Sequence, residues 1–176
     1  MGFVTAALCG LMFGRQTAAP QKIWQGFGVN IHFTEPAPGE MDLLRASGVD
    51  YVRTDLNWDS TEKSTGKYDF DVYDRLMALL KNANIRPVFV LDYGNKIYEA
   101  GAPKSASAQE AYAAWAGAVV AHFKGEEIVF EIWNEPNIDQ KWRPRADAYS
   151  YGSLALKAAR AMRSADPNCR IIAPGT

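Results

Sequence analysis

The stretch Ile128-Val-Phe-Glu-Ile-Trp-Asn-Glu-Pro-Asn137 decides how this chain is interpreted. It opens with a short β-branched and aromatic run, which is typical of a buried strand. Proline has no amide hydrogen, so a paired strand cannot continue past Pro136. Side chains alternate along a strand, and this alternation predicts that Glu135 shares a face with Glu131. The segment therefore predicts a strand that carries one carboxyl group at its end and another deeper on the same face.

Strand-like and helical patterns alternate along the rest of the chain, which is the signature of βαβ architecture. The expected strands lie near residues 23–33, 49–58, 85–93, 127–133 and 170–173. The expected helices lie near residues 40–46, from 73 to the left-handed terminator Asn84, from the capping-box pattern Ser107-Ala-Gln-Glu110 onward, and over 146–164. This pattern predicts an α/β fold with the first five strands and four helices of a (β/α)₈ TIM barrel. A complete barrel needs about 250 residues, whereas this chain has 176, so we expect the barrel to be incomplete.

The motif Asn134-Glu135-Pro136 resembles the acid/base strand of clan A glycoside hydrolases, in which Asn-Glu-Pro ends the fourth barrel strand. Further segments resemble neighbouring parts of that fold in the same order, at residues 28–33, 51–58, 66–70, 87–95 and 142–144. Together they are most similar to glycoside hydrolase family thirty-nine, which includes β-xylosidases, α-L-iduronidases and bacterial endoglycosidases. The resemblance extends from Ile23 to Thr176.

This resemblance implies a retaining glycosidase in which Glu135 is the general acid and then the general base. The family's nucleophile is a second Glu at the end of the seventh strand, and no position here corresponds to it. We therefore expect the nucleophile beyond Thr176, and we expect this chain alone to be inactive. Two other hypotheses stay open: a non-catalytic carbohydrate-binding remnant, and a half-barrel that needs a complementary carboxyl-terminal chain. For Glu135 itself, the structural alternative is an acid that caps the turn after the strand.

The resemblance also implies a set of substrate contacts. Asn134 would hydrogen-bond the sugar hydroxyl beside the anomeric carbon. Arg53 would lie near the nucleophile, or it could instead be half of a buried ion pair with Glu131, which we read as structural. The other candidates are polar or aromatic side chains at strand ends, each of which could equally be structural: His32, Trp58, Asp92, Tyr93, Asn95 and Trp142. Of these, the two tryptophans and the tyrosine are suited to stacking on sugar faces.

Composition argues against several other classes of protein. The 19 basic and 20 acidic residues are interspersed and the net charge is −1, so no basic patch for nucleic acid is visible. The chain has two histidines, His32 and His122, and lacks both a His-Glu-x-x-His motif and a glycine-rich phosphate loop. We therefore expect a carbohydrate substrate and neither a metal nor an organic cofactor.

Residues 1–19 resemble a secretory signal. The apolar stretch Phe3 to Phe13 is too short to span a bilayer, and Thr17-Ala-Ala19 fits a small-residue cleavage site. We therefore expect a secreted or periplasmic protein, with one domain over residues 20–176. Removal of the signal would take Cys9 with it and leave Cys169 as a single cysteine, which excludes a disulfide framework.

Overall fold

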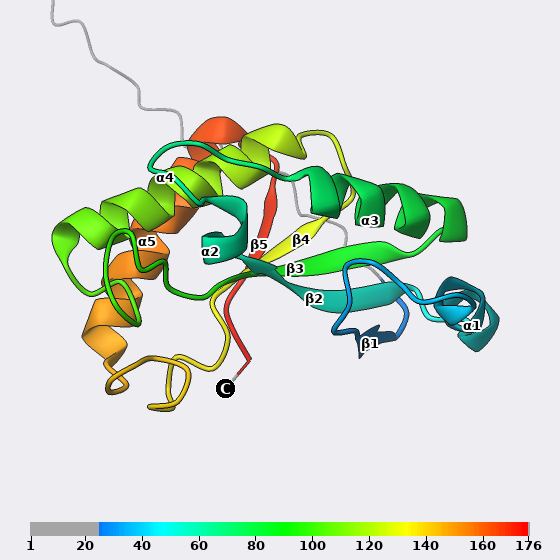
Figure 1. The fold of residues 1–176 in the computed structure, drawn as a ribbon, viewed down its shortest axis with the longest axis horizontal. Coiled ribbons are helices and arrows are strands. Elements are labelled where there is room, and N and C mark those ends of the chain that lie inside the picture. The colour runs from blue at the N-terminus through cyan, green and yellow to red at the C-terminus, as the bar shows by residue number, and fades with distance from the viewer. Residues whose placement is uncertain (1–24, 176) are drawn as a thin grey trace, which may run out of the picture.

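The structure is a computed structural model, and it describes residues 25–175. The signal-like segment 1–19 lies outside these residues, and its role stays a prediction. One parallel sheet, with the order β1-β2-β3-β4-β5, organises the described part of the chain (Figure 1). Its strands are Gly28–Asn30 (β1), Tyr51–Asn57 (β2), Arg86–Asp92 (β3), Val129–Ile132 (β4) and Arg170–Ile172 (β5). All five fall within the strand regions expected from the sequence, so the predicted α/β fold is confirmed.

Five helices connect these strands. They are Glu40–Ser47 (α1), Trp58–Thr61 (α2), Asp71–Ala83 (α3), Ala106–His122 (α4) and Ala148–Ala165 (α5). The short α2 was not expected, because its residues were assigned to the end of a strand and the loop after it. Asn84 ends α3 with φ 58°, the left-handed conformation that the sequence predicted. The cap of α4 differs from prediction: Ser105, and not Ser107, accepts the hydrogen bond from the backbone N–H of Ala108.

The two faces of the sheet have different surroundings. Alternate residues of β2 (Val52, Thr54 and Leu56) are buried, whereas the residues between them are partly exposed. Helices α2, α3 and α4 lie along the buried side (Figure 1). The partly exposed face is the one that would line the interior of a barrel. It is open among the described residues, and it carries the polar side chains discussed below.

A cluster of aromatic rings fixes α2 and α4 over the sheet. Trp58 stacks on Tyr98 and Trp115, with ring centroids 5.1 and 5.8 Å apart. The Trp115 indole N–H donates a 2.9 Å hydrogen bond to the Thr61 hydroxyl. Tyr112 and Trp115, three residues apart on one face of α4, are fully buried. Among residues 25–175, no helix has both the length and the apolar composition needed to cross a bilayer.

Candidate active site

The chain changes direction immediately after β4. The strand ends at Ile132, and both Trp133 (φ 72°) and Glu135 (φ 46°) have left-handed backbone conformations. Such conformations are uncommon for residues with side chains and carry a modest energetic cost. The prediction that strand alternation continues to Glu135 is therefore wrong. The turn, and not the pleat, determines where the Glu135 side chain lies.

A partly buried ion pair lies beneath this turn. Arg53 on β2 reaches across β3 to Glu131 on β4, and its Nε and a terminal guanidinium nitrogen donate hydrogen bonds of 2.7 and 2.9 Å to the two carboxylate oxygens. The backbone N–H of Gly175 donates a third, 3.0 Å long, to the same carboxylate. Glu131 is only 2% exposed. Its hydrogen bonds raise the pKa of the Arg53 guanidinium, which therefore stays charged.

The same arginine positions Asn134. A terminal guanidinium nitrogen of Arg53 donates a 3.0 Å hydrogen bond to the side-chain oxygen Oδ1 of Asn134. The side-chain nitrogen Nδ2 of Asn134 donates a 2.7 Å hydrogen bond to the Tyr93 hydroxyl. An amide nitrogen carries two hydrogens, so one donor of Asn134 remains available to a ligand. The amide is thus oriented by two partners and still has a hydrogen bond to give.

These residues line a hollow of about 360 Å³ on the open face of the sheet. Five of the nine predicted site residues meet there: His32, Arg53, Tyr93, Asn134 and Glu135. The carboxyl group of Glu135 forms no hydrogen bond with any residue between 25 and 175. It is partly exposed, so it can exchange a proton with a bound molecule.

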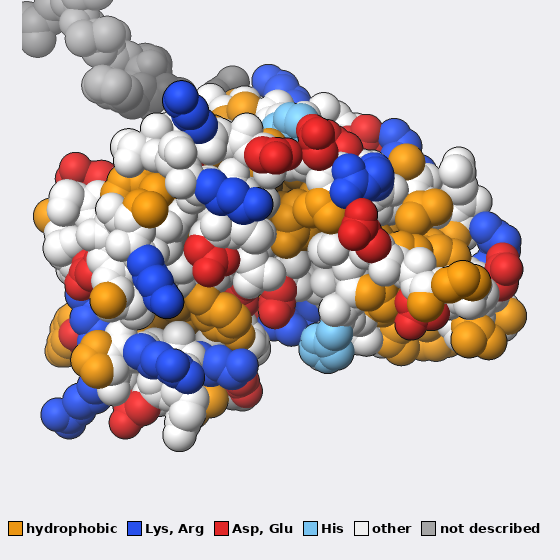
Figure 2. Space-filling model, viewed as in Figure 1, with side chains coloured by type: hydrophobic (Ala, Val, Ile, Leu, Met, Phe, Trp, Pro, Cys, Tyr) orange, Lys and Arg blue, Asp and Glu red, His pale blue; other side chains and the backbone are white. Residues whose placement is uncertain are grey.

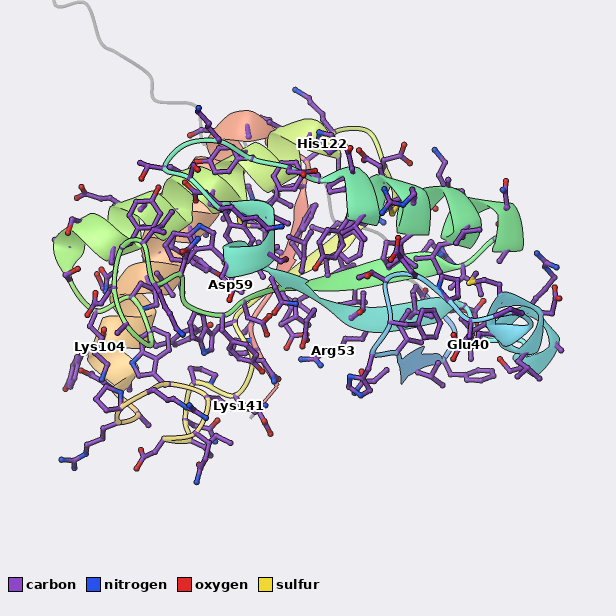
Figure 3. All side chains as sticks on the ribbon, viewed as in Figure 1. Glu40, Arg53, Asp59, Lys104, His122 and Lys141 are labelled. Carbon is purple, nitrogen blue, oxygen red and sulfur yellow. The ribbon has the colours of Figure 1, made fainter. Side chains whose placement is uncertain are left out.

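Four residues of this hollow lie outside the predicted site: Asn30, Asp55, Lys141 and Gly175. The ammonium group of Lys141 lies 5.3 Å from the centre of the Tyr93 ring. The nearby Tyr93 hydroxyl, with a smaller contribution from the charge of Glu135, raises the pKa of Lys141. The alternation of β2 could have indicated Asp55, which shares the face of Arg53. No local pattern marks Lys141, because it lies in the long loop after β4. Figure 3 labels Arg53 and Lys141 on the open side of the sheet.

Asp92 lies at the end of β3 but does not line the hollow. It is fully buried, and neither of its carboxyl oxygens has a hydrogen-bond partner among the described residues. Burial, with a smaller contribution from the charge of Asp55, raises the pKa of Asp92 to about 9. At neutral pH it is therefore an uncharged acid. The expected role as a polar subsite group does not fit this buried position.

Three further predicted contacts are also buried. Trp58 and Trp142 have no exposed surface, and Asn95 is 3% exposed. Trp142 packs edge-on against Trp133. The Asn95 amide donates a 2.7 Å hydrogen bond to the Glu62 carbonyl and accepts one from the Ile97 N–H, so it shapes its own loop. These positions correct the prediction that the three side chains contact a sugar.

Residues 25–175 contain no group of three His, Cys, Asp or Glu side chains that could hold a metal ion. A partly exposed carboxyl group lies beside a preoriented amide and a lysine. This arrangement can move a proton to or from a ligand oxygen while the amide holds a neighbouring hydroxyl.

Comparison with known proteins gives a consistent picture. Residues 16–176 match the family model described as cellulase (glycosyl hydrolase family 5). A β-xylosidase of Geobacillus stearothermophilus is 30% identical over 123 residues, which are 61% of this chain and 24% of that protein. Endo-1,4-β-xylanase C of Phanerodontia chrysosporium is 30% identical over 131 residues, 66% of this chain and 31% of that protein. The chain thus spans about a quarter to a third of these curated relatives.

Solved structures share the fold. A family 39 glycoside hydrolase from Bacteroides cellulosilyticus WH2 superposes with a TM-score of 0.67 and 23% identity, covering 84% of this chain and 32% of that one. A family 39 enzyme from Xanthomonas axonopodis pv. citri superposes with a TM-score of 0.68 and 24% identity, covering 83% of this chain and 34% of that one. The endoglucanase Cel5A of Pseudomonas stutzeri superposes with a TM-score of 0.68 and 20% identity, covering 84% of this chain and 51% of that one. The predicted resemblance to clan A glycoside hydrolases is confirmed: the family model is that of family 5, and two of these three structures belong to family 39.

Proposed function

Because the chain belongs to the cellulase family, glycosyl hydrolase family 5, we propose that the protein hydrolyses O-glycosidic bonds in an oligosaccharide or polysaccharide. Glu135 is the general acid/base of this reaction. The observation that carries the proposal is the hollow beside β4, where the carboxyl group of Glu135 lies next to the oriented amide of Asn134.

Glu135 first protonates the oxygen of the leaving sugar, and its carboxylate then takes a proton from the attacking water. Asn134 donates its remaining N–H to the hydroxyl beside the anomeric carbon, a contact that strengthens as positive charge develops on the sugar ring. Arg53 contributes indirectly, because it holds the Asn134 carbonyl while paired with Glu131. It is therefore a positioning residue in this mechanism.

Net retention requires a second carboxylate about 5 to 5.5 Å from the first. By analogy with the resemblance to family thirty-nine, we propose that a Glu following Thr176 supplies this nucleophile. The curated relatives are named for xylosides and xylan, so β-linked xylo-oligosaccharides are the first substrates to test.

The decisive experiment compares wild-type protein, expressed from the complete gene, with Glu135→Gln. Substrates with poor leaving groups, such as xylo-oligosaccharides, need the general acid, and their hydrolysis should fall by about 10²- to 10⁴-fold. Activated aryl glycosides need little protonation, so their glycosylation step should be largely retained. Glu110→Gln, which removes an exposed acid on α4, is the matched control.

The outcomes separate the hypotheses. Equal activity of Glu135→Gln and wild type on the poor substrates would remove Glu135 from the acid role. Oligosaccharide binding without any turnover by the wild type would favour the carbohydrate-binding remnant. Activity that appears only when a separate carboxyl-terminal chain is added would favour the half-barrel hypothesis.

A further inference from the structure

A second hollow of about 350 Å³ adjoins the one that contains Glu135. Tyr93 and Lys141 line both, so they form a shared wall between the two. The second hollow lies between the segment 94–104, which follows β3, and the segment 134–147, which follows β4. A ligand that occupied both hollows would contact Tyr93 and Lys141.

The two segments are tied to one another. The backbone N–H of Ala102 donates a 3.1 Å hydrogen bond to the Arg143 carbonyl, and the Lys104 ammonium donates one of 2.7 Å to the Arg145 carbonyl. Within the segment 94–104, Gly94 approaches the backbone of Gly101 so closely that a methyl group on Gly94 would lie 1.7 Å from the Gly101 carbonyl oxygen. The hollow is therefore already formed without a ligand.

Positive charge dominates its lining. Lys96, Lys141 and Arg143 face a single acid, Asp59. Within residues 25–175, none of the three cations belongs to an ion pair. The Arg143 Nε donates to the Gln140 carbonyl, which leaves its terminal nitrogens available. Figure 2 shows blue side chains gathered at the lower left, around the segment between β4 and α5, and Figure 3 labels Lys104 and Lys141 there.

The remaining lining is suited to a sugar. Tyr93, which is partly exposed, supplies an aromatic ring, and such a ring packs well against the apolar face of a pyranose. The volume falls within the range of small-molecule sites, ~300 to 1,000 Å³, and a bare inorganic anion would fill little of it. A neutral sugar would contact the Tyr93 ring but would form no ion pair with the three cations.

We propose that the second hollow is a subsite for a sugar residue that carries an anionic group, either a uronate carboxylate or a sulfate ester. It lies next to the residue that Glu135 processes, so this inference rests on the proposed function and narrows its substrate to acidic glycans. Arg143 and Lys96 hold the anionic group by charge-assisted hydrogen bonds. Lys141, on the shared wall, is positioned to contact either sugar.

The test is a binding measurement that needs no turnover. The ¹⁵N-labelled full chain is titrated with methyl β-glucuronide, methyl β-glucoside and methyl β-glucoside 6-sulfate, and amide shifts are followed in residues 94–104 and 134–147. We expect the anionic probe to bind at least about tenfold more tightly than the neutral one. Preference between the glucuronide and the sulfate identifies which anionic group the subsite takes. Raised salt should weaken the binding of the anionic probes and leave the binding of the neutral glucoside unchanged.

Paired variants localise the effect. Lys96→Gln with Arg143→Gln should reduce anionic binding to the level of the glucoside. Lys63→Gln with Arg160→Gln removes an exposed lysine and an exposed arginine outside both hollows and should leave the preference intact. Thermal melts show whether each variant is folded, and a single Arg143→Lys variant, which keeps the charge, should retain part of the preference.

Equal affinity for the three probes, or no binding of any, would overturn the proposal. An equal loss in the two double variants would also overturn it, because the preference would then reflect the general charge of the protein. Failure here is distinguishable from failure of the proposed function. A protein that prefers the glucuronide but hydrolyses no glycoside would support the anionic subsite and contradict the proposed hydrolase function. A protein that hydrolyses glycosides without preferring the anionic probes would support the hydrolase function and contradict the subsite.

Discussion

Arg53 and Glu131 form a two-hydrogen-bond ion pair that crosses β3 and ties β2 to β4. The sequence left two alternatives for Arg53, a structural ion pair or a role at the site. The structure shows that the two are compatible, because the guanidinium also donates to Asn134. One partly buried arginine thus supports the sheet and orients the amide above it.

Removal of Arg53 should be costly for stability. Arg53→Met leaves the Glu131 carboxylate, whose side chain is 3% exposed, without a cation, and breaking such a pair costs about 3 to 5 kcal/mol of unfolding free energy. Adding Glu131→Met removes the orphaned charge and should recover most of that loss. Urea unfolding measures the wild type and both variants. The control is Arg75→Met, which breaks the exposed pair with Glu35 and should cost no more than about 1 kcal/mol. A similar small loss for Arg53→Met would contradict the prediction.

Asp92 should make the protein less stable as the pH rises. Its pKa is about 9 in the folded chain, against an ordinary value of 3.8, so between these values the folded state holds a proton that the unfolded state has released. The unfolding free energy should therefore fall from about pH 4 to about pH 9, by up to ~1.4 kcal/mol per pH unit. Asp92→Asn cannot lose a proton, so its advantage over wild type should grow across this range. Melting curves at several pH values test this, and parallel curves for the two proteins would refute it.

Two glycine substitutions should have opposite effects. Gly94→Ala forces a methyl group against the Gly101 carbonyl oxygen and should lower the unfolding free energy by about 1 to 3 kcal/mol. Gly152 lies inside α5 with open space around it, so Gly152→Ala should raise stability by about 0.5 to 1 kcal/mol. Chemical denaturation of both variants provides the comparison. Equal changes in unfolding free energy would mean that the backbone of the segment 94–104 shifts at little cost to accommodate a side chain at Gly94.

The sequence predicted the elements of the fold because their signals are local. Gly48 and Asn84 end their helices in left-handed conformations, and the alternation of side chains along β2 puts Arg53 on the open face. These outcomes depend on a few neighbouring residues and on backbone sterics. A single chain is enough to recognise them.

Side-chain burial at the strand ends was harder to predict because distant segments decide it. Trp58 follows β2, as a sugar-stacking residue could, but Tyr98 and Trp115 cover its two sides. Asn95 likewise becomes structural through a carbonyl that lies 33 residues earlier in the chain. The position of Glu135 depends on left-handed residues that strand periodicity cannot anticipate. The motif therefore indicated which residues matter at the site without giving their geometry.

The last prediction concerns Tyr93, which accepts the hydrogen bond that fixes the Asn134 amide. Tyr93→Phe keeps the ring but removes the acceptor, so the amide loses one of its two anchors. A neutral hydrogen bond contributes about 1 kcal/mol, and kcat/KM for an aryl glycoside should therefore fall by roughly five- to tenfold. Asn134→Asp should cost more, because a carboxylate cannot donate to the sugar hydroxyl. Tyr68→Phe, a similar substitution at a partly buried ring outside both hollows, is the control. If Tyr93→Phe retained the same kcat/KM as that control, the amide would not depend on Tyr93 for its orientation.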